Sequence, residues 1–164
     1  LVTSNQLSDL LRREADIAIR HARPQEDNLI AKRVRTTTAQ LYASSTYIKE
    51  VGRPNKVSDL AAMQFVGVED PEWLIGPLMG LGIEVTSANF NFSAVSGAVY
   101  LELLRQGFGL GFLPAEIAER YPELENMWPA LEPMQIETWL VAHRELRTNP
   151  RIRLVFDLLS DGLS

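Results

Sequence analysis

Two stretches of the sequence place hydroxyl and amide side chains at the expected start of a helix. One helix is predicted to run to Arg13 and the other to Gln106. Free N–H groups and the positive end of the dipole make a helix N-terminus a receptor for carboxylates or phosphates. Ordinary capping explains the same pattern, so the residues alone leave both roles open. The side chains concerned are Thr3, Ser4, Asn5, Asn91, Phe92 and Ser93.

The only two histidines each stand beside an arginine at the end of a predicted strand. Arg20 and His21 follow a strand at residues 17–19, and His143 ends a long strand that begins at Met134. If these strands are neighbours, the two histidines come close together. Two histidines without a third ligand do not make a metal site. We therefore expect hydrogen bonding or a pH-sensitive contact with a ligand, and no bound metal or cofactor.

An acidic loop, with Glu69, Asp70 and Glu72, follows a predicted strand at residues 65–68. Open α/β sheets bind ligands at the carboxyl ends of their strands. Either the loop is only solvated, or Glu69 lines a ligand site. In the second case a polyanionic ligand is disfavoured, and an amine or a neutral polar molecule is permitted.

Three glycines, Gly107, Gly109 and Gly111, resemble a nucleotide-binding motif only superficially. A phosphate fingerprint follows a strand and opens a helix, whereas this stretch closes a helix and opens a strand at residues 110–113. We interpret it as a helix cap with close helix–sheet packing. Motifs of serine hydrolases, zinc proteases and P-loop proteins are absent from the sequence, so no enzyme is predicted.

Composition narrows the class of protein. The 164 residues carry a net charge of -5, and their basic residues form no stripe. We therefore do not expect these residues to bind nucleic acid directly. Cysteine is absent, which fits a reducing compartment, and we expect a cytoplasmic protein. The sequence has neither an apolar run of membrane-spanning length nor a signal peptide, so no membrane partner is predicted. Because it begins on Leu1 and Val2, which read like the end of a strand, we expect a piece of a longer chain.

Predicted strands alternate with predicted helices along the whole chain. This alternation favours the α/β class with a largely parallel sheet. The threonine run 36–38 lies between or within two expected strands, at 29–34 and 39–43, and a further strand is expected at 85–90. A further helix, which Ser44 and Ser45 can cap, is predicted to run to Val51 and to stop at Gly52. The last helix is predicted to start at Pro150 after a cap at Thr148 or Asn149.

Taken in order, several segments resemble the effector-binding domain of LysR-type transcriptional regulators. No single motif is specific, but their order and spacing cover nearly the whole chain. The matching segments are L-S-D-L-L at 7–11, E-A-D-I-A-I-R at 14–20, L-Y-A-S at 41–44, Tyr47, G-R-P at 52–54, S-D-L at 58–60, Phe65, Q-G-F-G-L-G-F-L-P at 106–114 and the closing helix at 150–159.

The resemblance implies two Rossmann-like lobes joined by two crossover strands, as in type II periplasmic binding proteins. Lobe I would comprise residues 1–21 and 141–164, and lobe II residues 22–140. A small-molecule effector would bind between the lobes. The family's winged helix-turn-helix would precede Leu1 and is therefore expected outside this chain.

Function follows from the same resemblance as an expectation. The chain would sense an effector and pass the change to DNA-binding domains through a dimer or tetramer, so that DNA is contacted only by the missing N-terminal part. The ligand contacts expected are Thr3, Ser4, Asn5, Arg20, His21, Glu69, Asn91, Phe92, Ser93 and His143. A solute-binding protein of a transport system is the alternative with the same fold, and a small α/β enzyme is a third possibility.

Overall fold

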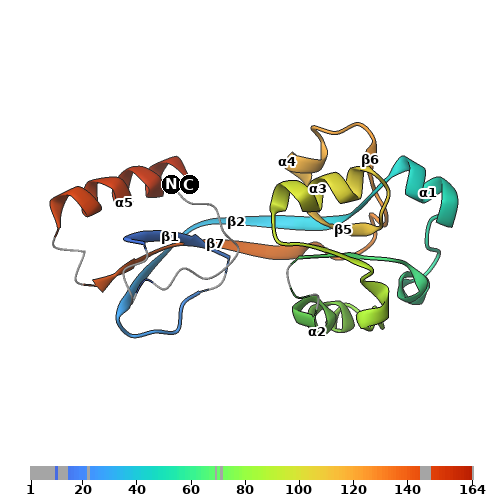
Figure 1. Ribbon diagram of the computed structural model, residues 1–164, viewed down its shortest axis with the longest axis horizontal. Coiled ribbons are helices and arrows are strands. Elements are labelled where there is room, and N and C mark those ends of the chain that lie inside the picture. The colour runs from blue at the N-terminus through green and yellow to red at the C-terminus, as the bar shows by residue number, and fades with distance from the viewer. Residues whose placement is uncertain are drawn as a thin grey trace. The chain divides into compact units, whose positions relative to one another are not determined.

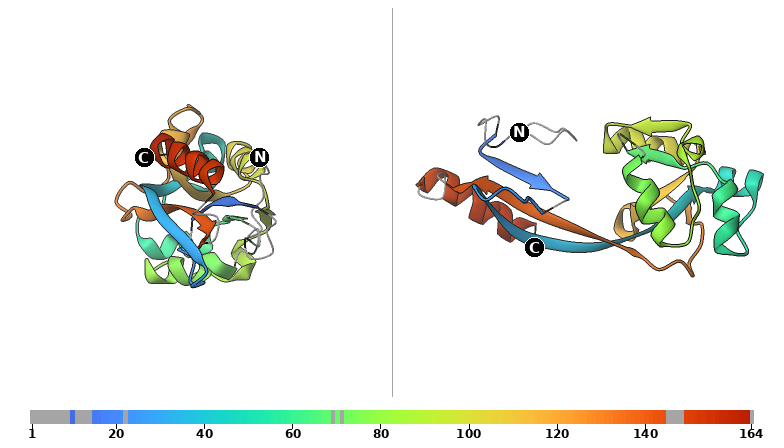
Figure 2. Two further views of the ribbon diagram at one scale, coloured as in Figure 1. Left: turned by 90° about the vertical axis from the view of Figure 1, so that its left-hand side faces the viewer. Right: turned by 90° about the horizontal axis from the view of Figure 1, so that it is seen from below.

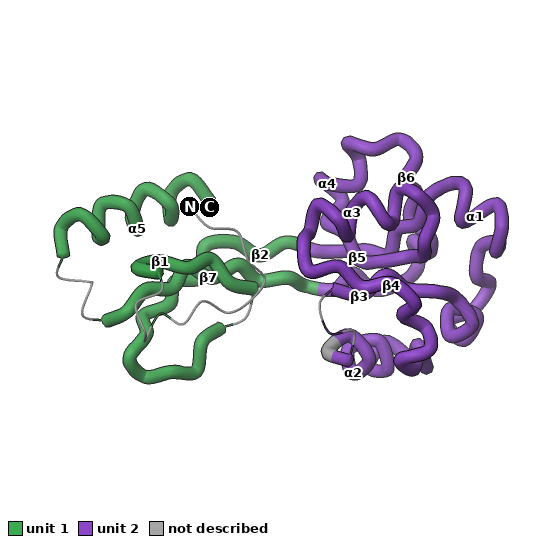
Figure 3. The backbone as a smooth tube through the Cα atoms, in the orientation of Figure 1, with its two compact units in different colours: residues 1–37, 135–164 green, residues 38–134 purple. Residues whose placement is uncertain are grey.

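The computed structural model describes residues 10, 15–21, 23–68, 70, 72–144 and 149–163. Its helices and strands confirm the α/β class. The chain divides into two compact units, residues 1–37 with 135–164 and residues 38–134 (Figure 3). The second unit is shorter than the predicted lobe of residues 22–140, and the assignment of the two units to the family's lobes stays a prediction.

The first unit is a sheet with a helix on one face. Strand β1 (Ile17–Arg20) pairs antiparallel with β7 (Met134–His143), and β7 neighbours β2 (Leu29–Ser44). Helix α5 (Pro150–Gly162) lies along these strands in Figure 1 and in the right-hand view of Figure 2. Its buried Ser160 accepts a hydrogen bond from Lys32 Nζ on β2, which ties the helix to the sheet.

The second unit combines antiparallel and parallel strands. The carboxyl-terminal part of β2 pairs antiparallel with β5 (Leu110–Pro114) and with β6 (Leu124–Asn126), whereas β3 (Val66–Val68) and β4 (Phe92–Ala94) form a parallel pair. Its helices are α1 (Ser45–Val51), the 3₁₀ helix η2 (Val57–Ala62), α2 (Glu72–Gly80), the 3₁₀ helix η3 (Ser87–Asn89), α3 (Gly97–Arg105) and α4 (Ala115–Ala118). Among the described helices, none has the length and apolar character that a membrane crossing requires.

Alternate residues of β2 serve two hydrophobic clusters of the second unit. Leu41 and Ala43 belong to a cluster with Phe65, and Tyr42 belongs to a cluster with Leu104. Successive side chains of a strand point to opposite faces, so one strand supplies both clusters.

Two expectations about the sheet are wrong. The segments 29–34 and 39–43 form the single strand β2, because the β-branched residues 36–38 continue the extended backbone. The sheet is not largely parallel either, since β1 runs antiparallel to β7, and β5 and β6 run antiparallel to β2. Alternation of strands and helices predicts parallel pairing only for strands that a crossover helix joins. Here the long strands pair with partners distant in sequence, so the alternation does not determine their relative direction.

The predicted strand 85–90 is also wrong. The Asn89 side-chain amide donates to the carbonyl oxygens of Ala61 (2.8 Å) and Met63 (3.0 Å), and its Oδ1 accepts from the Thr86 N–H (2.9 Å). These bonds hold the segment in a 3₁₀ turn. The strand β4 therefore starts later, at Phe92, and Ser93 lies within it instead of capping the following helix.

The three glycines form part of the scaffold, as predicted. Gly107 has a φ of 82° just after α3, which favours glycine. At Gly109 (φ 153°), a Cβ would stand 2.7 Å from the Gln64 carbonyl oxygen. At Gly111, a Cβ would stand 2.1 Å from the Tyr100 hydroxyl oxygen. Helix α3 and β3 can therefore approach β5 closely because side chains are missing there.

Gly109→Ala is expected to destabilise the chain by about 2–3 kcal/mol, since it combines an unfavourable φ with a clash against backbone. Urea unfolding followed by circular dichroism measures the effect. Gly76→Ala is the matched control, because Gly76 lies in α2 and a Cβ there meets no atom within 4 Å. Equal stability of the two variants would contradict this account of the glycine.

Candidate functional site

The parallel pair of the second unit forms an open edge at its carboxyl end. Gly67 lies opposite Ser93 and Val68 opposite Ala94, and the chain then enters α3 at Gly97. Residues 91–93 and 95–99 are exposed, whereas Ala94 is buried. Backbone from β4 and the first turn of α3 is thus accessible at one edge, where open α/β sheets bind ligands.

Among the described residues, no side chain caps the start of α3. Ser96 stands at the N-cap position, where its carbonyl oxygen accepts from the Tyr100 N–H (2.8 Å), but its hydroxyl makes no capping hydrogen bond. A Cβ at Gly97 would meet no atom within 4 Å, so the backbone is unobstructed there. The N–H groups of a first helical turn lack partners within the helix, and they attract a carboxylate or another acceptor.

Sequence reasoning missed Ser96 and Gly97 as the start of this helix. A serine–glycine pair is a turn signal, and a serine one turn ahead of buried Tyr100 is a helix-start signal. The sequence therefore contains the signals that mark Ser96 as the N-cap of this helix. The sequence points to Ser93 because this residue follows the predicted strand 85–90, which the structure does not form. The expected capping by Ser93 is wrong, and its contact with a ligand stays a prediction.

Phe92 lies against the opposite end of α3. Its ring contacts Phe108 in an edge-to-face arrangement with the centroids 4.7 Å apart, and Phe108 follows the last turn of the helix. The two rings are 42% and 44% exposed. The structure thus gives Phe92 a packing contact away from Ser96.

Within the acidic loop, the Asp70 carboxylate has a structural partner. Asp70 Oδ1 accepts from the Glu72 N–H at 2.9 Å, which satisfies an amide at the start of α2. Four of the predicted ligand contacts lie outside the described residues. They are Thr3, Ser4, Asn5 and Glu69.

In the first unit, the two histidines do not meet. Arg20 pairs with Trp139 and Ile17 with Ala142, so His21 continues toward Thr138 while His143 lies five residues further along β7. Five residues of extended strand span roughly 16 Å. The expected approach is wrong because antiparallel pairing sets the end of β1 beside the middle of β7. Among the described residues, no group of three carboxylate or histidine side chains could hold a metal ion.

Arg20 is held in place at the end of β1. Its side chain is only 9% exposed, and Nη1 lies 3.9 Å from Glu26 Oε1. His21 beside it is exposed. The structure thus fixes the arginine and leaves the imidazole accessible to solvent.

A second polar cluster surrounds Trp139 on β7. Its indole Nε1 donates to Glu137 Oε2 (3.0 Å), and Arg33 Nη1 donates to Glu137 Oε1 (2.6 Å). The Arg23 guanidinium carbon lies 5.5 Å from the centre of the Trp139 ring, within the range of a cation–π contact. The hydrogen bond from Arg33, followed by that from Trp139, lowers the pKa of Glu137.

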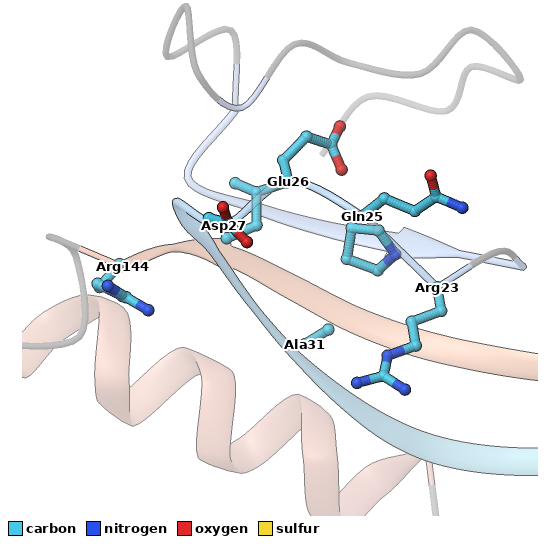
Figure 4. Close-up of a pocket in the computed structure, with 8 residues that line it drawn as sticks. Arg23, Gln25, Glu26, Asp27, Ala31 and Arg144 are labelled. Atoms are coloured by element: carbon cyan, nitrogen blue, oxygen red, sulfur yellow. The ribbon is translucent and has the colours of Figure 1, made fainter.

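An open hollow of about 610 Å³ adjoins this cluster. Figure 4 shows the guanidinium groups of Arg23 and Arg144 on either side of Ala31. Both signs of charge line the hollow, so it does not select a ligand by charge alone. The lining residues are Arg23, Pro24, Gln25, Glu26, Asp27, Leu29, Ala31 and Arg144, and none of them was a predicted site residue.

Comparison with known proteins identifies the family. The model of the LysR substrate binding domain matches residues 1–164. The chain belongs to this family. It is 23% identical over 171 residues to the HTH-type transcriptional regulator CrgA of Neisseria meningitidis serogroup C, strain 8013, with 99% of the chain and 56% of CrgA covered. The chain thus spans about half the length of the curated relatives that it matches.

Solved structures of LysR-type regulators share the fold. The regulatory domain of CrgA from Neisseria meningitidis superposes with a TM-score of 0.78 at 21% identity, covering 94% of this chain and 78% of that one. The regulatory domain of a C227S variant of AphB from Vibrio vulnificus gives 0.71 at 20% identity, covering 97% and 82%. The predicted family and its α/β fold are confirmed.

The Arg33–Glu137–Trp139 network predicts a pH-dependent stability. The folded-state pKa of Glu137 lies below its ordinary value of 4.5, so its contribution is complete above that value and is lost as the pH falls through the folded pKa. Urea midpoints of the wild type and Glu137→Gln should therefore differ at neutral pH and converge in acid.

Glu84→Gln provides the control, because Glu84 is exposed and forms no ion pair with a described residue. Its midpoint should follow the wild type at every pH. A difference between wild type and Glu137→Gln that does not change with pH would contradict the proposed network.

Proposed function

We propose that this chain is the small-molecule effector-sensing domain of a bacterial LysR-type transcriptional regulator. The observation that carries the proposal is the family match over residues 1–164. It favours a regulator over the alternatives, a solute-binding transport protein and a small α/β enzyme, because the relatives are transcriptional regulators. A role on chromosomal DNA also implies a cytoplasmic protein.

The effector contact that the geometry supports best is the uncapped start of α3. A carboxylate or a neutral polar group of the effector would accept hydrogen bonds from the first-turn N–H groups and from the Ser96 hydroxyl, and Ser93 on the adjoining strand would add a second hydroxyl. Both serines are exposed, so such a contact requires no rearrangement of the core.

Further contacts remain part of the proposal. The Arg20 side chain is only 9% exposed and pairs with Glu26, so it would present a fixed cation, whereas the exposed His21 would offer its imidazole for a hydrogen bond. The other residues proposed to contact the effector are Thr3, Ser4, Asn5, Glu69, Asn91, Phe92 and His143.

Signal transmission would use a population shift. An effector that binds one arrangement of the chain's lobes more tightly than another raises the population of that arrangement by its difference in affinity. A dimer or tetramer of the longer protein would pass the change to DNA-binding domains outside this chain. The net charge of -5 supports indirect contact with DNA.

An effector found by thermal-shift screening of carboxylates, amines and neutral polar compounds should bind Ser96→Ala about fivefold more weakly, through loss of a hydrogen bond. The stability of this variant should stay within about 0.5 kcal/mol of the wild type, since the hydroxyl caps nothing. Calorimetric titration and urea unfolding measure the two quantities.

Two variants act as references. Ser87→Ala removes an exposed hydroxyl from η3 and should change neither quantity. Ser44→Ala removes a true cap, because Ser44 Oγ accepts from the Tyr47 N–H, and should cost about 1 kcal/mol of stability. Unchanged effector affinity of Ser96→Ala would contradict the proposed contact, and stabilisation by dicarboxylates alone would contradict a role for Glu69.

A further inference from the structure

The closing helix α5 has an outer face that carries apolar side chains. Leu154 and Leu158 are 62% and 63% exposed, whereas Phe156 on the inner face lines a small hollow against Ile30 and Ala142. The two leucines lie four residues apart, which places them one above the other on a helix. Together they form an apolar stripe that the described chain does not cover.

Charged residues of opposite sign lie at the two ends of the apolar stripe. At about 100° per residue, Arg151, Leu154, Leu158 and Asp161 all project within about 40° of the direction opposite Phe156. Arg151 lies in the first turn and Asp161 in the last. Within the described part of the chain, neither of these two side chains has an ion pair. On the flank of the helix, by contrast, Arg153 Nε lies 3.8 Å from Asp157 Oδ2.

The placement of these charges opposes the helix dipole. A helix start is stabilised by acidic side chains and a helix end by basic ones. Helix α5 has no acidic residue in its first turn and no basic residue in its last. Arg151 and Asp161 therefore do not serve the isolated helix, and an antiparallel neighbour would remove the conflict.

We propose that the outer face of α5 pairs with α5 of a second copy of this chain. The positions 151 and 161 have the same midpoint as 154 and 158, namely 156. One two-fold axis opposite Phe156 thus sets Leu154 against the partner's Leu158 and Arg151 against the partner's Asp161. Each contact occurs twice, and each helix start lies beside the partner's helix end.

The contact is small. A helix of 13 residues is about 20 Å long, and one such pair buries less area than the roughly 1,600 Å² of a standard interface. The α5 contact therefore associates weakly by itself and strengthens an oligomer whose copies are also held elsewhere. It requires no effector, so it is independent of the function proposed above.

Charge reversal tests the pairing. Arg151→Glu sets two acidic groups together at each end and Asp161→Arg sets two basic groups together, so each variant should self-associate about tenfold more weakly than the wild type. An equimolar mixture of the two variants restores opposite charges at both ends, as does the double variant R151E/D161R. Sedimentation velocity over a concentration series measures all of these.

Arg153→Glu is the matched control, because it makes the same charge change on the flank of the same helix. Both reversals on the stripe favour the helix dipole, so loss of association cannot come from unfolding of α5. The proposal would be overturned if the wild type associated no more tightly than the single variants, or if the mixture of the two variants did not regain wild-type association. It would also be overturned if Arg153→Glu weakened association as much as the reversals on the stripe. Effector affinity should be the same in every variant.

Discussion

The close approach of Gly109 to the Gln64 backbone is the constraint on which the second unit depends. Leu110 N–H donates to the Gln64 carbonyl oxygen (2.9 Å), and Leu110 forms a parallel bridge with Phe65. The Tyr47 hydroxyl accepts from the Gln64 N–H (2.9 Å) at the same point. This seam joins the antiparallel strands β2 and β5 to the parallel pair, and only glycine at position 109 leaves room for it.

The open edge at α3 follows from this seam. Strand β4 is positioned by β3, and α3 is fixed from its buried side, where the Tyr100 hydroxyl lies over Gly111 and donates to the Phe112 carbonyl oxygen (3.3 Å). Burial raises the pKa of Tyr100 well above its ordinary value, so the phenol stays a neutral donor. Because the Tyr100 contact fixes the buried side of α3 against β5, the exposed amino end of the helix has a defined position, as a binding site requires.

Local signals in the sequence predicted elements whose ends are determined by nearby residues. Ser44 and Gly52 bound α1, and Asn149 with Pro150 starts α5, because caps and proline act within one turn. Predictions failed where distant contacts decide. The bonds of Asn89 to residues 61 and 63 displaced β4, and antiparallel pairing separated the histidines. At the candidate edge, Ser93 was predicted, but the true start of α3 was not.

The central claim is that an effector meets this chain at the start of α3. Amide chemical-shift mapping by NMR, with an effector obtained from the thermal-shift screen, tests it most directly. The account predicts the largest changes at the amides of Gly97, Ala98 and Val99, with little change at Gly76 in α2. Changes confined to the hollow lined by residues 23–31, with none at the start of α3, would contradict it.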